Sequence, residues 1–134
     1  MILNETSLLS KAKSALESIP NWSLPSTQFI KQISNGPSNH SWLIESNGMQ
    51  AVLRIDKQFA HEHLLDRQNE ATIQTICANN GFSPQLIYSD PEQGIFLSQF
   101  ISGRTWTSND LQNKKQLSIL AKRLLLFHLS LIHI

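Results

Sequence analysis

The sequence is poor in the residues that mark several classes of protein. It contains a single cysteine, Cys77, so it forms no internal disulfide, and this fits a reducing compartment. It has no run of lysine and arginine and a net charge of only +1, so nucleic acid and acidic membrane surfaces are not implied as partners. No apolar stretch is long enough for a membrane span, and the N-terminus lacks the pattern of a signal peptide. We therefore expect a cytoplasmic protein that binds neither membranes nor nucleic acid.

Composition and periodicity predict one α+β domain. Hydrophobic residues make up 40% of the 134 residues and charged residues 16%, which is typical of a globular protein with its own core. Turn residues separate the periodic stretches, and their order predicts an antiparallel sheet with a helix packed on it. The predicted segments are helices at 5–19, at 61–80 and from Thr107 onward, and strands at 29–33, 41–45, 49–55, 85–88 and 95–101.

A basic residue lies in the middle of one predicted strand. The dipeptide Asn47-Gly48 favours positive φ at both central turn positions, so it predicts a two-residue hairpin between the strands on either side. Alternation along the second of these strands places Val52 and Arg54 on one face. We expect something other than solvent to cover a guanidinium in this place.

An acid on the following helix is the predicted partner of this arginine. Glu70 shares one stripe of the helix with Ile73 and Cys77, at spacings of three and four residues. An acid on an inward stripe needs a cation, and Arg54 is the candidate. The alternative is a surface arginine and a helix glutamate that never meet, because mixed charges are common on exposed faces.

The remaining residues with possible chemistry have structural interpretations. His61 and His63 are two residues apart, which does not place them on one helical face, so we expect solvated side chains rather than metal ligands. Cys77 is predicted to be a small core residue. The tryptophans are too scattered to form a stacking platform for single-stranded nucleic acid.

Six short motifs follow one another between residues 30 and 128. They are Ser34-Asn35-Gly36-Pro37-Ser38-Asn39, Val52-Leu53-Arg54-Ile55, Arg67-x-x-Glu70, Gly81-Phe82-Ser83-Pro84, Phe100-Ile101-Ser102-Gly103-Arg104-Thr105-Trp106 and a leucine-rich stretch that ends at His128. In this order they resemble the aminoglycoside phosphotransferase and choline/thiamine kinase family, which has a protein-kinase-like fold. The resemblance implies the N-terminal lobe of an ATP-dependent phosphotransferase.

The resemblance also implies partners and roles. The partners are a nucleotide, ATP with Mg²⁺, and a small-molecule hydroxyl acceptor such as choline, thiamine or an aminoglycoside. Arg54 would stand where this fold usually carries the phosphate-contacting lysine, held by Glu70. Val52, on the same face, would lie against the adenine ring.

Two further segments receive nucleotide-binding roles from the resemblance. The turn at 34–39 would fold over the phosphates and offer backbone N–H groups, although Pro37 removes one donor. The segment 99–101 would be the hinge and would offer backbone groups to the adenine edge. The alternative for the turn is an ordinary hairpin turn, and the alternative for the hinge is a buried strand end. The turn residues in question are Asn35, Gly36, Ser38 and Asn39, and the hinge residues are Gln99, Phe100 and Ile101.

The chain departs from the family in its acids. Phosphoryl transfer needs an aspartate that orients the acceptor hydroxyl and a further acid that holds Mg²⁺. No aspartate lies in a His-x-Asp catalytic loop or in an Asp-x-Glu metal motif after the hinge, so we expect this chain alone to be inactive and the metal ligands to lie in a missing second lobe. The rival interpretation is a non-enzymatic α+β binding or interaction module. The aspartates are Asp56, Asp66, Asp90 and Asp110.

The resemblance divides the chain into three parts. Residues 1–101 form the kinase-like lobe, and residues 102–128 form the linker and the start of a second-lobe helix. Residues 129–134 read Leu-Ser-Leu-Ile-His-Ile, which one frame of the end of a common transposon-based sequencing adaptor encodes. We therefore expect a non-native tail in a gene truncated by sequencing.

Overall fold

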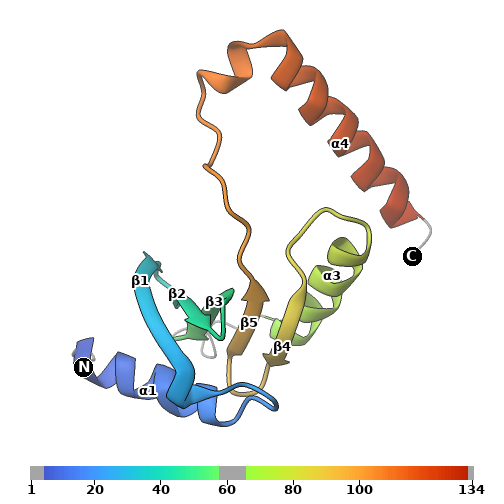
Figure 1. Cartoon of the computed structure of the whole chain (residues 1–134). Helices are drawn as coiled ribbons and strands as arrows, with labels where there is room; N and C mark the ends of the chain where they lie inside the picture. The colour runs from blue at the N-terminus through green and yellow to red at the C-terminus, as the bar shows by residue number, and fades with distance from the viewer. Residues whose placement is uncertain (1–4, 58–65, 133–134) are drawn as a thin grey trace.

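The computed structural model describes residues 5–57 and 66–132 of the chain. In chain order, the elements are α1 (Glu5–Glu17), the 3-10 turn η1 (Leu24–Ser26), β1 (Thr27–Asn35), β2 (Asn39–Ser46), β3 (Met49–Asp56), α3 (Arg67–Asn79), β4 (Leu86–Asp90), β5 (Ile95–Gln99), the 3-10 turn η2 (Asp110–Gln112) and α4 (Lys114–Ile132). Figure 1 shows the sheet with α1 and α3 beside it and α4 at the end of an extended linker.

The strands form one antiparallel sheet in the order β1-β2-β3-β5-β4, which confirms the predicted α+β class. Leu16 of α1 packs with Leu53 of β3 and Leu97 of β5 in the main core cluster. Alternation places Arg54 and Ser98 on the opposite face, where α3 reaches both of them. The sheet is therefore covered by α1 on one face and by α3 on the other.

The predicted hairpin joins β2 to β3. Asn47 has φ 51° and Gly48 has φ 79°, as a two-residue turn with both central residues at positive φ requires. Its register pairs Leu43 with Val52 and Ser41 with Arg54. This register places Arg54 on the face that α3 covers.

Helix α3 is the predicted second helix, with one correction. Asp66 caps its N-terminus by accepting a hydrogen bond from the Asn69 backbone at 2.8 Å, and the predicted start at 61–65, including both histidines, lies outside the described residues. Ile73, predicted to face inward, is 47% exposed. Gln74 faces the sheet, because its side chain bonds Ser98. Ile73 is one residue away, which is about 100° around the helix, so it lies at the edge of the interface.

Several strand boundaries also differ from the prediction. Strand β1 continues through Asn35 and β2 begins at Asn39, because the antiparallel ladder extends through the polar residues, so the turn is limited to 36–38. Strand β5 ends at Gln99 rather than at residue 101. Phe100 still donates its backbone N–H to Gln50 at 3.2 Å, but Ile101 is 62% exposed.

The C-terminal helix begins later than predicted. Asp110 accepts hydrogen bonds from the backbone and hydroxyl of Thr107, at 2.7 and 3.2 Å, but this pair closes only the turn before η2. The helix α4 starts at Lys114, where the Asn113 carboxamide caps Lys115 at 2.9 Å. The helix ends near α3, with the Phe127 ring edge-on to Phe82 at 5.4 Å.

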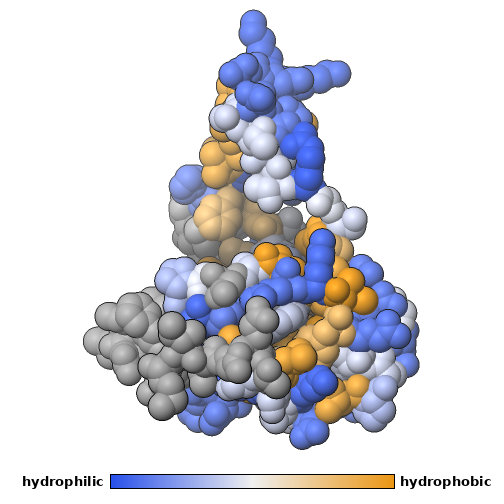
Figure 2. Space-filling view, turned by 90° about the vertical axis from the view of Figure 1, so that its left-hand side faces the viewer, coloured by the Kyte–Doolittle hydropathy of each residue, from blue (hydrophilic) through white to orange (hydrophobic). Residues whose placement is uncertain are grey.

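Hydrophobic side chains remain on the surface of α4. Leu117 is 50% exposed and Leu124 is 49% exposed, and Figure 2 shows hydrophobic residues along the helix where it rises from the body. Within the described ranges, no helix is long and apolar enough to cross a membrane.

Candidate functional site

Arg54 and Glu70 meet across the face between β3 and α3. Arg54 Nη1 donates to Glu70 Oε1 at 2.6 Å, so the predicted ion pair is present. The Arg54 guanidinium carbon lies 4.2 Å from the centroid of the Phe96 ring, which belongs to the paired position on β5. An aromatic face at this distance attracts a cation and fixes the plane of the guanidinium.

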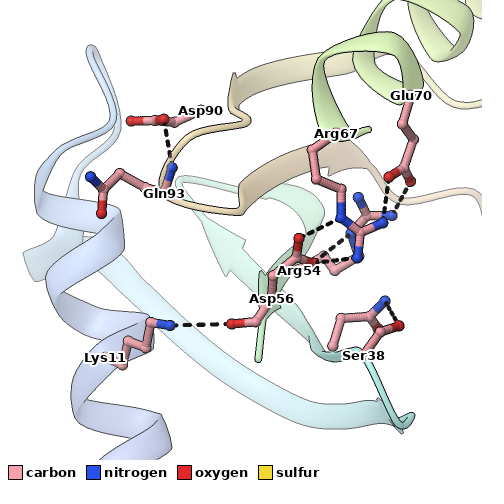
Figure 3. Close-up of polar contacts among 9 residues, drawn as sticks. Lys11, Ser38, Arg54, Asp56, Arg67, Glu70, Asp90 and Gln93 are labelled. Atoms are coloured by element: carbon pink, nitrogen blue, oxygen red, sulfur yellow. Dashed lines mark hydrogen bonds and ion pairs between the residues drawn. The ribbon is translucent and has the colours of Figure 1, made fainter. Parts of the chain in front are cut away.

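A second ion pair, which the sequence pattern did not predict, adjoins the first (Figure 3). Arg67 donates to both carboxylate oxygens of Asp56, from Nε at 2.5 Å and from Nη2 at 3.0 Å. Its Nη1 also donates to Glu70 Oε2 at 2.5 Å. The sequence carried a signal for both residues, because Asp56 follows Arg54 by two on a strand and Arg67 precedes Glu70 by three on a helix.

These contacts shift the proton equilibria of the cluster. Burial raises the pKa of Glu70, but hydrogen bonds from Arg54 and Arg67 and their positive charges outweigh it, so the pKa lies below its ordinary value. Burial lowers the pKa of Arg67, and its bonds to Glu70 and Asp56 more than compensate, so the pKa is raised. Glu70 is therefore an anion and Arg67 a cation at neutral pH.

Two nitrogens of Arg54 lack partners. In the part of the chain that the structure describes, Nε and Nη2 are buried and have no hydrogen-bond acceptor. Arg54 lines a hollow of about 230 Å³ together with Val52 and Gln99. A buried, unpaired donor is costly, so an anionic acceptor entering here would be favoured.

The predicted turn is bonded to the end of β3, and part of it belongs to strands. Lys57 fastens the turn to the end of β3, since its Nζ donates to Gly36 O at 2.6 Å and its backbone donates to Ser38 O at 2.9 Å. Asn39 donates to the Ser38 hydroxyl at 3.4 Å, and Asn35 is a β1 residue paired with His40. Thus Asn35 and Asn39 belong to strands rather than to the turn.

The hinge residues do not share one hollow. Gln99 lines both the hollow at Arg54 and a more open one of about 490 Å³, whereas Phe100 lines only the second, beside the β2–β3 hairpin. Within residues 5–57 and 66–132, no group of histidine, cysteine and acidic residues could hold a metal ion. Cys77 is a free, buried cysteine, as predicted.

The chain was compared with protein families and with solved structures. The family model for choline/ethanolamine kinase matches residues 30–133. The solved structure of an ethanolamine kinase from Plasmodium vivax superposes with a TM-score of 0.73 at 19% identity, over 96% of this chain and 35% of that one. The chain thus spans about a third of that protein's length, and no curated protein sequence matches it.

Proposed function

Since the chain belongs to the choline/ethanolamine kinase family, we propose that it is the nucleotide-binding lobe of a kinase that transfers the γ-phosphoryl group of ATP to the hydroxyl of a small amino alcohol. Choline and ethanolamine are the acceptors that the family name suggests. The kinase-like lobe supports the coarse assignment. The state of Arg54 is the observation that supports ATP as the donor.

Arg54 is prepared to bind an anion. Glu70 and Phe96 orient its guanidinium, the residue lines the hollow, and its Nε and Nη2 have no hydrogen-bond partner among the described residues. Two adjacent N–H donors match two oxygens of a phosphate group, so Arg54 would bind the phosphates of ATP in a bidentate manner. Positioning and neutralisation of phosphate charge are the main contributions that a protein makes to phosphoryl transfer.

The other predicted residues fit supporting roles around the same face. Val52 offers an apolar surface next to Arg54 on which the adenine ring would rest. The backbone at Gln99 and Phe100 would bond the adenine edge, and the turn at 36–38 would cover the phosphates. Mg²⁺ accompanies ATP in this chemistry, and the described residues lack a metal site, so its ligands would lie outside them.

Calorimetric titration of the purified chain with Mg·ATP tests the proposal. We expect saturable binding that Arg54→Ala weakens on the order of tenfold or more, because a charge-assisted bidentate contact is lost. Arg123→Ala, which removes an exposed arginine on α4, serves as the control and should bind as the parent does. Absence of binding by a chain with a folded NMR spectrum would contradict the proposal and favour a non-enzymatic interaction module.

A further inference from the structure

The two arginines of the cluster differ in how fully they are engaged. Arg67 bonds acids through all three of its nitrogens, two of them on Asp56 and one on Glu70. Among the described residues, Arg54 hydrogen-bonds an acid only through Nη1. Among the described residues, the cluster therefore contains one guanidinium with all three nitrogens bonded to carboxylates and one with two nitrogens unpaired, although both lie beside the same two acids.

Asp56 is close enough to compete for Arg54. Its side chain is fully buried, and its Oδ1 lies 4.0 Å from Arg54 Nε, just beyond hydrogen-bond distance. A buried carboxylate without a counterion is costly and attracts the nearest cation. As long as Arg67 occupies both oxygens of Asp56, Arg54 has little to gain by moving toward it.

The backbone holds Asp56 in place. Its N–H donates to Gly94 O at 2.8 Å, and its carbonyl accepts from Lys11 Nζ at 3.2 Å. The carboxylate is therefore a fixed anchor at the end of β3, and Arg67 ties the first turn of α3 to it (Figure 3).

We infer that Arg67 is a positioning residue that keeps Arg54 available to phosphate. It neutralises Asp56, which would otherwise close on Arg54 Nε, and it orients Glu70 through Oε2, the oxygen that Arg54 does not bond. This inference rests on the proposed function, in which Arg54 binds the phosphates of ATP. Arg67 itself bonds only the two acids in the described chain and acts through Arg54.

Comparison of ATP with adenosine tests this role in Arg67→Gln. With Asp56 free to take Arg54, we expect the affinity for Mg·ATP to fall on the order of tenfold, while adenosine, which has no phosphate, binds as before. Affinities are measured by calorimetry on variants whose folded fraction is known from denaturant unfolding. An equal loss for ATP and adenosine would mean that Arg67 only maintains the structure, and would overturn the inference.

Removal of the competing carboxylate provides the second arm. We expect the double variant Arg67→Gln/Asp56→Asn to recover ATP affinity to within about threefold of the parent chain, because an amide does not attract Arg54 as a carboxylate does. A double variant that binds ATP as weakly as Arg67→Gln alone would show that Asp56 does not compete for Arg54.

An NMR measurement separates this inference from the proposed function. The ¹⁵Nε–H resonance of Arg54 should shift and exchange more slowly with water in Arg67→Gln, and return in the double variant, whether or not nucleotide binds. An unchanged resonance in Arg67→Gln would overturn the inference. If the parent chain does not bind ATP but the resonance behaves as expected, the proposed nucleotide is wrong. The competition of Arg54 and Arg67 for Asp56 is then still established.

Discussion

Gly94 and Asp56 are packed so closely that there is no room for a side chain at residue 94. A Cβ there would lie 2.6 Å from Asp56 Cβ and 3.1 Å from Oδ2, and Gly94 has φ +65°. The same glycine accepts the Asp56 backbone N–H at 2.8 Å. The turn between β4 and β5 therefore helps to place the carboxylate that anchors Arg67.

We expect Gly94→Ala to destabilise the chain more than Gly48→Ala. Both substitutions place alanine at positive φ, at a cost of about 1–2 kcal/mol each. Gly48 has no atom within 4 Å of the added Cβ, whereas Gly94 meets Asp56, which adds roughly 1–3 kcal/mol of overpacking. Denaturant unfolding of the two variants measures the difference, and equal losses would show that Asp56 moves aside freely.

The β2–β3 hairpin provides a test of the register that places Arg54. Gly48→Val should lower the free energy of unfolding by about 1 kcal/mol or more, because a β-branched residue is disfavoured at φ 79°. Gly48→Asn is the control, since asparagine tolerates positive φ. Equal denaturant midpoints for the valine and asparagine variants would contradict the predicted turn.

The Arg54–Glu70 pair was one of the two outcomes that periodicity allowed, and the structure shows that the two side chains meet. The hairpin turn sets the register, alternation places Arg54 on one face, and the helical repeat turns Glu70 toward that face. The Arg67–Asp56 pair was missed because it depends on how the first turn of α3 approaches the end of β3. The exposure of Ile73 was missed for a similar reason, since periodicity gives a stripe and tertiary packing decides its edge.

The cluster also predicts how stability depends on pH. The folded-state pKa of Glu70 lies below the ordinary value of 4.5, so its contribution is present above pH 4.5 and is lost as pH falls through the folded pKa. We expect Glu70→Gln to lower stability at neutral pH and to flatten the acid limb below pH 4.5. The measurement is unfolding free energy against pH, with Glu92→Gln in an exposed turn as the control.

The titration of His40 affects stability in a different pH range from that of Glu70. Burial, with the charges of Lys57 and Lys11, holds the pKa of His40 below its ordinary value of 6.5. The unfolded chain therefore binds more protons just below pH 6.5, and stability falls there before Glu70 titrates. If the unfolding free energy of Glu70→Gln falls as steeply below pH 4.5 as that of the parent chain, Arg54 and Arg67 do not stabilise the Glu70 carboxylate.

The last prediction is that this chain, by itself, consumes no ATP in the presence of an acceptor. Transfer needs a carboxylate that orients the acceptor hydroxyl, and every aspartate already holds another group. Asp56 binds Arg67, Asp66 caps α3, Asp90 accepts the Gln93 backbone N–H, and Asp110 binds Arg104 through both oxygens.

An ATP-consumption assay with choline, ethanolamine, thiamine and an aminoglycoside measures this. We expect no acceptor-dependent turnover, even where Mg·ATP binds, because Arg54 would neutralise phosphate charge while the aspartates are engaged with other groups. Turnover with any of the four would contradict the prediction. If turnover occurred, Asp56→Asn and Asp110→Asn would be measured as separate variants. Loss of turnover in one of them would identify the carboxylate that leaves its arginine and orients the acceptor hydroxyl.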